Sequence, residues 1–175
     1  MIWKGRGRMA DLPIRIDPVP AEAFAFTGGN MALALLEKRY SLRGEVAALQ
    51  AFTAVPLPSK IGDVSERGAE LAVMLGPDEW LLLGTIIGDG SGQAVSITEI
   101  TERQITITLK GARAAEILMS GCPLDLERMA IGRGTRTIYE TVEIVVMKRG
   151  VEQFHIEVWR SFAPWLWAAL VVAAG

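Results

Sequence analysis

The amino-acid sequence predicts an α+β fold in which strand-helix-strand repeats are internally duplicated and the sheets are antiparallel. The first observation is a gap-free match between the segment that starts at Tyr40 and the segment that starts at Ile107. Its constant offset is 67 positions, the separation of Gly44 and Gly111, and a fixed offset of this kind indicates a duplicated unit. The second observation is that each copy is followed by two strand-like runs joined by a tight turn, the pattern of a β-hairpin.

Each repeat is expected to begin with a strand that ends at a glycine and to continue into a short helix. Ile105, Ile107 and Leu109 alternate with polar residues before Gly111, as in a strand with one buried face. Apolar residues then recur at helical spacing, and a third helical segment follows the second hairpin. The expected helices are Glu45–Phe52, Ala112–Ser120 and Ala163–Val172.

The expected hairpin turns are Gly76–Glu79 in the first repeat and Lys148–Gly150 in the second. The first hairpin is not followed by a helix. It is followed by the glycine-rich segment GTIIGDGSGQ from Gly84 and then by AVSITEI, whose alternation predicts a strand. A phosphate-binding loop needs a helix N-terminus after its glycines, so we interpret this segment as a flexible connection.

The length of 175 residues is that of one domain. We expect residues 31–175 to form it, with repeats at about 38–92 and 95–175, after an N-terminal stretch 1–30 that is poorly ordered or divergent. The net charge of −2 gives no electrostatic reason to expect binding to nucleic acid or to a membrane. The apolar segment from Phe162 is shorter than the roughly 20 residues of a membrane span, and no secretory signal is apparent. With a single cysteine, a cytoplasmic location is expected.

Two residues could carry chemistry, and both are interpreted as structural. Cys122 lies between Gly121 and Pro123 with no neighbouring cation to activate its thiol, so we expect a small buried apolar residue. His155 faces away from its apolar strand neighbours and has no evident partner of the kind a general base needs, so we expect a solvated or hydrogen-bonded imidazole. One cysteine and one histidine provide no metal-ligand set. We therefore assign no catalytic and no metal-binding residue.

Basic and aromatic residues mark candidate surfaces. The pairs Lys38–Arg39 and Lys148–Arg149 flank strands or turns and are interpreted as solvated charges that protect sheet edges. Trp159, Trp165 and Trp167 cluster near the C-terminus. Core packing would explain such a cluster, and aromatic anchors at a protein interface are the alternative. We take these three tryptophans as the candidate partner interface.

Four segments, in order and in spacing, resemble the gamma subunit of bacterial heterotetrameric sarcosine oxidase. They are LGPDEWLL from Leu75, LKGARAAEILMSGCPLDL from Leu109, RTIYETVEIVVMKRG from Arg136 and FHIEVWRSFAPWLWAAL from Phe154. That family is similar in fold to the folate-binding domain of the glycine-cleavage aminomethyltransferase, an α+β duplication of strand-helix-strand units. The resemblance covers most of the chain from Tyr40, and the shortened first repeat after Gly84 departs from it.

The resemblance implies a non-catalytic scaffold subunit of a cytoplasmic complex that oxidatively demethylates sarcosine and passes the one-carbon unit to tetrahydrofolate. The implied partners are the large alpha subunit, on which this chain would dock, together with beta and delta subunits. FAD, FMN, NAD and tetrahydrofolate would be bound by the other subunits, and no cofactor by this chain.

Asp125 is a folate candidate through the resemblance to the aminomethyltransferase, which places a functional acid after the same strand-glycine-helix unit. Here the turn reads Pro123-Leu124-Asp125-Leu126, and the polar block that follows in that family is replaced by YETVEIVVMKRG. A turn-capping or surface acid is therefore the expectation. Two alternatives to the scaffold role stay open: a stand-alone tetrahydrofolate-binding protein of the aminomethyltransferase type, and an orphan homo-oligomer.

Overall fold

The computed structural model describes residues 17–34, 38–88, 90 and 92–175. The predicted N-terminal stretch 1–30 therefore falls partly outside the described residues. Its described part contains β1 (Phe24–Phe26) and the start of β2 (Gly29–Ala34), which pair with each other as antiparallel strands. The predicted boundary at residue 31 falls inside β2, and the division of the chain into these two parts stays a prediction.

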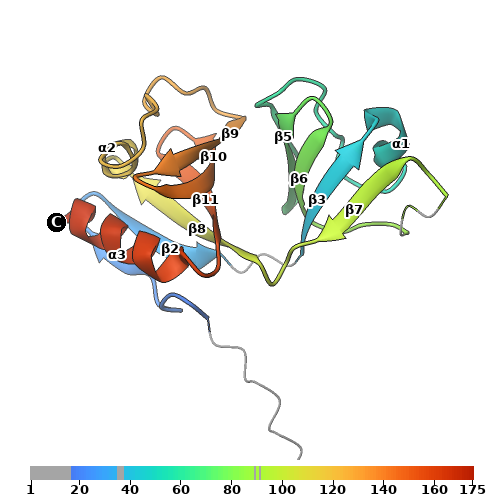
Figure 1. The fold of residues 1–175 in the computed structure, drawn as a ribbon. Helices are drawn as coiled ribbons and strands as arrows, with labels where there is room; N and C mark the ends of the chain where they lie inside the picture. Colours follow the sequence, from blue (N-terminus) through green and yellow to red (C-terminus); the bar gives the residue numbers. More distant parts are fainter. Residues whose placement is uncertain (1–16, 35–37, 89, 91) are drawn as a thin grey trace, which may run out of the picture.

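A six-stranded antiparallel sheet holds the C-terminal half of the chain together with β1 and β2 (Figure 1). Its order is β1-β2-β8-β11-β10-β9, so the N-terminal strands extend the sheet at β8. The remaining strands are β8 (Gln104–Gly111), β9 (Arg133–Tyr139), β10 (Val142–Gly150) and β11 (Gln153–Trp159). Alternate residues of β8, Ile105, Ile107 and Leu109, are buried as predicted.

A five-stranded antiparallel sheet holds the N-terminal half in the order β4-β5-β6-β3-β7. Its strands are β3 (Arg39–Gly44), β4 (Val64–Arg67), β5 (Glu70–Gly76), β6 (Glu79–Leu83) and β7 (Val95–Glu99). The strand predicted after the glycine-rich segment is β7, and it is the first element after those glycines in the described residues, so no helix begins directly after them. The phosphate-loop interpretation therefore lacks the helix N-terminus it needs.

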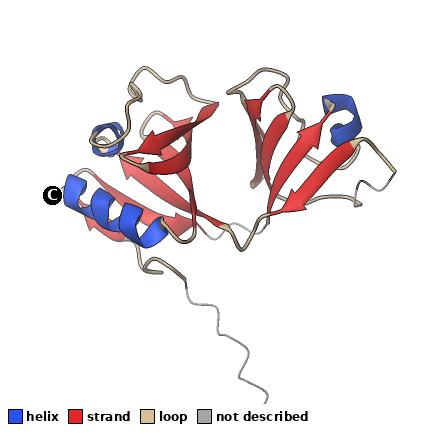
Figure 2. Cartoon of the chain, in the orientation of Figure 1, coloured by secondary structure: helices blue, strands red, loops and turns tan. Residues whose placement is uncertain are grey.

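In the part of the chain that the structure describes, three helices cover the outer faces of the two sheets (Figures 1 and 2). They are α1 (Val46–Gln50), α2 (Ala114–Met119) and α3 (Ala163–Ala174), each within or close to a predicted range. Helices α2 and α3 pack on the six-stranded sheet around one core, and α1 packs on the five-stranded sheet around another. The predicted α+β architecture with antiparallel sheets is confirmed.

The two sheets share one strand arrangement. In each, the strand before the short helix lies between the last strand of a three-stranded meander and one further strand, β7 in one sheet and β2 in the other. Both leading strands end at a glycine in the left-handed region, Gly44 with φ 135° and Gly111 with φ 119°. Both hairpins also carry a register shift just before the turn, at Met74/Gly76 and at Lys148/Gly150.

The inner faces of the sheets pack on each other. Leu71, Val73 and Leu81 of the smaller sheet meet Val145 and Met147 of the larger one in a third apolar cluster. The sheet edges are also joined, since Asp63 and Arg133 form an isolated antiparallel bridge beside β4 and β9. The two halves are thus connected by apolar packing and by backbone hydrogen bonds.

Two sequence predictions about charged segments are wrong. Residues Lys148–Gly150 belong to β10, and the turn lies at Val151–Glu152. The basic pairs are not simply solvated, because Arg39 and Lys148 are buried. Lys148 Nζ donates to the carbonyl oxygens of Leu126 and Glu127, so it holds the loop before β9 rather than protecting an edge.

Arg39 connects the two sheets through a buried ion pair. Its Nε donates to Glu157 Oε2 at 2.9 Å, and its Nη2 donates to Thr106 Oγ1 at 2.8 Å. Thr106 also bonds to the Glu157 carboxylate. The side chains of Arg39 and Glu157 are 4% and 0% exposed, so water stabilises neither charge and each charge is compensated by the other.

Candidate functional site

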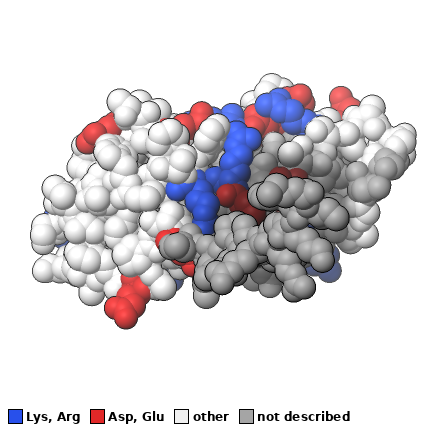
Figure 3. Space-filling view, turned by 60° about the horizontal axis from the view of Figure 1, so that its bottom comes forward, with Lys and Arg blue, Asp and Glu red and all other residues white. Residues whose placement is uncertain are grey.

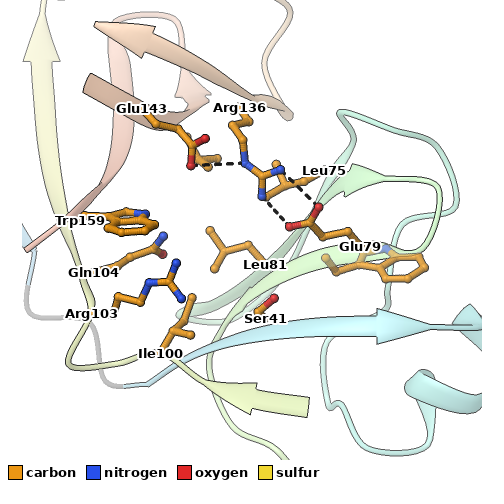
Figure 4. Close-up of a pocket in the computed structure, with 12 residues that line it drawn as sticks. Ser41, Leu75, Glu79, Leu81, Ile100, Arg103, Gln104, Arg136, Glu143 and Trp159 are labelled. Carbon is orange, nitrogen blue, oxygen red and sulfur yellow. Dashed lines mark hydrogen bonds and ion pairs between the residues drawn. The ribbon is translucent and has the colours of Figure 1, made fainter. Parts of the chain in front are cut away.

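A small cavity lies at the border of the contact between the sheets. Figure 4 shows Gln104, Arg103 and Trp159 on one side of it and Arg136 with Glu79 and Glu143 on the other. Its volume is about 110 Å³. Ligand pockets for drug-sized molecules occupy roughly 300–1,000 Å³, so this cavity cannot enclose a molecule as large as a folate.

Arg136 forms the charged wall of this cavity. Its guanidinium donates two hydrogen bonds to the carboxylate of Glu79 on the opposite sheet, and its Nε lies 3.7 Å from Glu143. The hydrogen bond from Arg136 holds the pKa of the Glu79 carboxyl below its ordinary value, against the opposing effect of burial. The ion pair of Arg136 and Glu79 therefore joins the two sheets. Figure 3 shows Lys and Arg side chains together with acidic ones along the middle of the molecule.

Asp125 lies on an open groove of about 690 Å³ beside the bridged sheet edges. Its Oδ1 accepts a hydrogen bond from the backbone N–H of Arg128, and its Oδ2 lies 3.3 Å from Arg128 Nε. The carboxylate thus caps a turn in the way expected of a surface acid. The apolar part of the groove includes Ile61, which is half exposed.

Cys122 and His155 are both placed as structural residues. Cys122 is buried in the larger core, 4.0 Å from Thr137 Oγ1. His155 is half-buried on the inner face of β11, within 3.5 Å of Arg149 and Gln153. Burial and the neighbouring cations Arg149 and Lys110 lower the pKa of His155 to about 4. The imidazole is therefore neutral at pH 7, which does not suit a site for binding anions.

Helix α3 is apolar along its whole length, yet the described residues of the chain cover it on one side only. Ala163, Leu166 and Leu170 face the core with full burial. On the outer side Trp165 is 41% exposed and Val172 is 80% exposed. An all-apolar helix is normally buried on every side, so this outer face is an unusual surface for a chain on its own.

The apolar surface continues past the start of α3. Phe162 is 46% exposed and its ring contacts Trp159, whose own side chain is partly buried. Trp165 packs edge-on against Tyr139, and the two line a shallow groove of about 510 Å³ with the outer face of α3. We call the exposed set Phe162, Trp165 and Val172 the α3 surface.

The three predicted interface tryptophans are thus divided. Trp165 lies on the α3 surface, and Trp159 lies between that surface and the cavity. Trp167 is 7% exposed and packs in the core, so core packing and not the interface explains this residue. Figure 3 shows few charged side chains on the part of the molecule that carries α3.

Clusters of metal-ligating side chains and long apolar helices were both sought in the described residues. Residues 17–34, 38–88, 90 and 92–175 bring together no group of three or more histidine, cysteine or acidic side chains that could hold a metal ion. Within these same ranges, no helix has the length and apolar character needed to span a membrane.

The chain is similar to a curated protein and to several solved structures. No protein-family model matches the chain. The gamma subunit of sarcosine oxidase from Corynebacterium sp. (strain U-96) is 29% identical over 121 residues, which cover 63% of this chain and 59% of that protein. The predicted resemblance to sarcosine oxidase gamma is confirmed. The match spans less than two thirds of that protein's length.

Solved structures support the same fold. A chain of the heterotetrameric sarcosine oxidase from Corynebacterium sp. U-96, in complex with pyrrole 2-carboxylate, superposes with a TM-score of 0.76 at 23% identity, over 88% of this chain and 87% of that one. Aminomethyltransferase T of the glycine cleavage system from Bartonella henselae gives a TM-score of 0.57 at 16% identity, over 77% and 43%. This chain therefore has the aminomethyltransferase-like fold that the resemblance implied.

Several site residues were not found from the sequence. Arg103, Gln104 and Arg136 line the cavity, and Phe162 extends the apolar surface. The alternation of polar residues along 104–110 indicated only that one face of that strand was not core. It could not indicate that a second sheet covers that face.

Proposed function

We propose that this chain is a non-catalytic gamma-type subunit that docks on the large alpha subunit of a cytoplasmic heterotetrameric sarcosine oxidase and acts as a scaffold. The observation that carries the proposal is the α3 surface, an apolar helix face left uncovered by the described residues of this chain. Large aromatic residues in such a position are typical anchors of protein interfaces. The similarity to a sarcosine oxidase gamma subunit supports the choice of partner.

The surroundings of His155 and Cys122 also support a role without catalysis by this chain. His155 is neutral and held between Arg149 and Gln153, and Cys122 is buried away from solvent. Neither forms a nucleophile and base pair of the kind that covalent catalysis needs. Oxidation of sarcosine, with FAD, FMN, NAD and tetrahydrofolate as cofactors, would then take place on the other subunits.

We further propose that the two halves arose by internal duplication. The shared strand order of the two sheets and the equivalent glycines Gly44 and Gly111 support this origin. After its hairpin the second half then continues into helix α3, whereas the first half continues into strand β7.

Co-expression with the large subunit tests the docking proposal. A tagged chain should co-purify with the large subunit, and the pair should remain together at micromolar concentration in gel filtration. A chain that instead elutes free of the large subunit would contradict the proposal. Light scattering of the isolated chain then distinguishes a monomer from the homo-oligomer that the orphan alternative requires.

A tetrahydrofolate-binding protein of the aminomethyltransferase type is the second candidate, favoured by the groove that Asp125 lines. The groove volume of about 690 Å³ lies in the range of small-molecule sites. Calorimetry of the isolated chain with tetrahydrofolate separates the candidates. Tight binding that Asp125→Ala abolishes would favour this second function, whereas the scaffold proposal expects no measurable heat of binding.

A further inference from the structure

The α3 surface lies within reach of a segment of this same chain, residues 1–16, which is outside the described residues. We propose that in the free subunit this N-terminal segment covers the α3 surface, and that the large subunit displaces it on docking. The displacement rests on the proposed function, because it regulates the docking surface named there. The contact itself belongs to the isolated chain and is tested there.

The N-terminal segment joins the described chain beside the start of α3. Asp17 is the first described residue, and its Oδ1 lies 3.6 Å from Arg160 Nη2, two positions before Phe162. Val19 is buried in the core to which α3 also belongs. Figure 1 shows the described chain beginning below α3. The end of the segment is therefore held next to the first residue of the α3 surface.

The N-terminal segment is long enough to follow the whole helix. With 12 residues, α3 is about 18 Å long at about 1.5 Å per residue. An extended chain spans about 3.3 Å per residue, so about six residues reach from one end of α3 to the other. The join at Asp17 also gives the segment an effective concentration of roughly millimolar at this surface. Weak contacts are therefore sufficient.

The charges of the N-terminal segment and of the surface are opposite. Residues 1–16 have a net charge of +3, from four basic residues and one acidic residue, although the whole chain has a net charge of −2. Glu140 lines the groove beside α3 and Glu143 lines a smaller one of about 280 Å³ at Phe162, and the described residues that line these grooves include no basic side chain. Glu140 is exposed and forms no ion pair within the described part of the chain. A basic segment therefore suits both grooves.

The N-terminal segment also carries apolar side chains near its join to the described chain. Leu12, Ile14 and Ile16 stand at alternate positions. Alternate side chains of an extended chain point to the same side, so the three together would contact the exposed rings of Phe162 and Trp165. Burial of this apolar surface would stabilise the contact in addition to the charges.

NMR of the isolated ¹⁵N-labelled chain tests the contact, with the indole N–H of Trp165 as reporter. Its signal is assigned by Trp165→Phe. The indole of Trp80, which donates to the carbonyl oxygen of Pro58 in the other half of the molecule, is the internal control. Replacing residues 2–16 by a Gly-Ser sequence of equal length should shift the Trp165 signal. Exchange of this N–H with water should become about threefold faster or more, as for a surface covered at least two thirds of the time. The Trp80 signal should stay unchanged.

Charge variants of the N-terminal segment show what holds it. Arg6→Glu/Arg8→Glu keeps the length and the apolar residues of the segment and should change the Trp165 signal in the same direction as the Gly-Ser sequence. Arg6→Lys/Arg8→Lys keeps the charge and should leave the signal as in the wild type. Identical Trp165 signals in the wild-type and Gly-Ser chains, or equal effects of the two double variants, would overturn the proposal.

Binding to the large subunit tests the displacement. The Gly-Ser chain should bind about threefold more tightly than the wild type or better, because the apparent Kd rises as the open fraction of the surface falls. Equal affinities would overturn the displacement. If no complex forms, the docking proposal fails and the displacement fails with it, whereas the Trp165 signal still decides whether the segment covers the surface. The two proposals can therefore fail separately.

Discussion

The buried pair Arg39 and Glu157 is the residue-scale feature on which the contact between the two halves depends most. Arg39→Met leaves the Glu157 carboxylate buried, with Thr106 as its remaining hydrogen-bond partner among the described residues, and we expect the variant to destabilise the fold by about 3–5 kcal/mol. The double variant Arg39→Met/Glu157→Met should lose less, because no unpaired charge remains. Urea unfolding measures both. A single variant within about 1 kcal/mol of the wild type would show that the pair does not hold the sheets together.

His155 should make the free energy of unfolding depend on pH, because its surroundings lower the pKa of its imidazole. Its pKa in the folded chain is about 4, against an ordinary value of 6.5, because it is half-buried and faces Arg149 and Lys110, with Glu66 opposing them. The unfolded chain therefore binds a proton first as the pH falls. Stability present above pH 6.5 should be lost progressively toward pH 4. Urea midpoints at pH 7 and pH 5 should differ less in His155→Gln, and an unchanged difference would contradict this account.

Gly44 and Gly111, which end β3 and β8, allow the two halves to be compared at the scale of the element. Both have positive φ, so Gly44→Ala should cost about 1–3 kcal/mol from backbone strain alone. Gly111→Ala should cost more, because its Cβ would lie 2.0 Å from the carbonyl oxygen of Gly28. The nearest atom to a Cβ at Gly44 is 3.0 Å away. Equal losses in thermal unfolding would contradict the tighter β2–β8 contact.

The elements themselves could be predicted better than their burial. The alternation before Gly111 and the apolar spacing of 163–172 predicted β8 and α3, because both patterns are local. The burial of Arg39 could not be predicted, since its partner Glu157 lies 118 positions away on the other sheet. The burial of Trp167 could not be predicted either, because it also depends on packing between segments. Its neighbours Leu166 and Trp165 are equally apolar, and only the docking of α3 decides which of them face the core.

At the scale of the whole molecule, two small sheets pack on each other through their inner faces, and the part of the chain that the structure describes leaves the outer side of the C-terminal helix uncovered. The pattern from Tyr40 and Ile107 predicted two similar units, and the strand of each copy lies in a different sheet, but β7 of the second predicted repeat joins the sheet of the first, and β1 and β2 join the other. The pattern held no information about how the units face each other. For this reason the cavity residues Arg103, Gln104 and Arg136 came only from the structure, although the aromatic cluster already indicated a surface near Trp165.

Sedimentation of the purified chain with the large subunit tests the central claim most directly. The account predicts a complex of the two that Trp165→Glu weakens by about 2 kcal/mol or more, as for a central interface anchor. Ile87→Glu is the matched control, because Ile87 is an exposed apolar residue in the other half of the chain and should leave association unchanged. Absence of a complex with the wild-type chain, or a Trp165→Glu variant that binds as tightly as the wild type, would contradict the account.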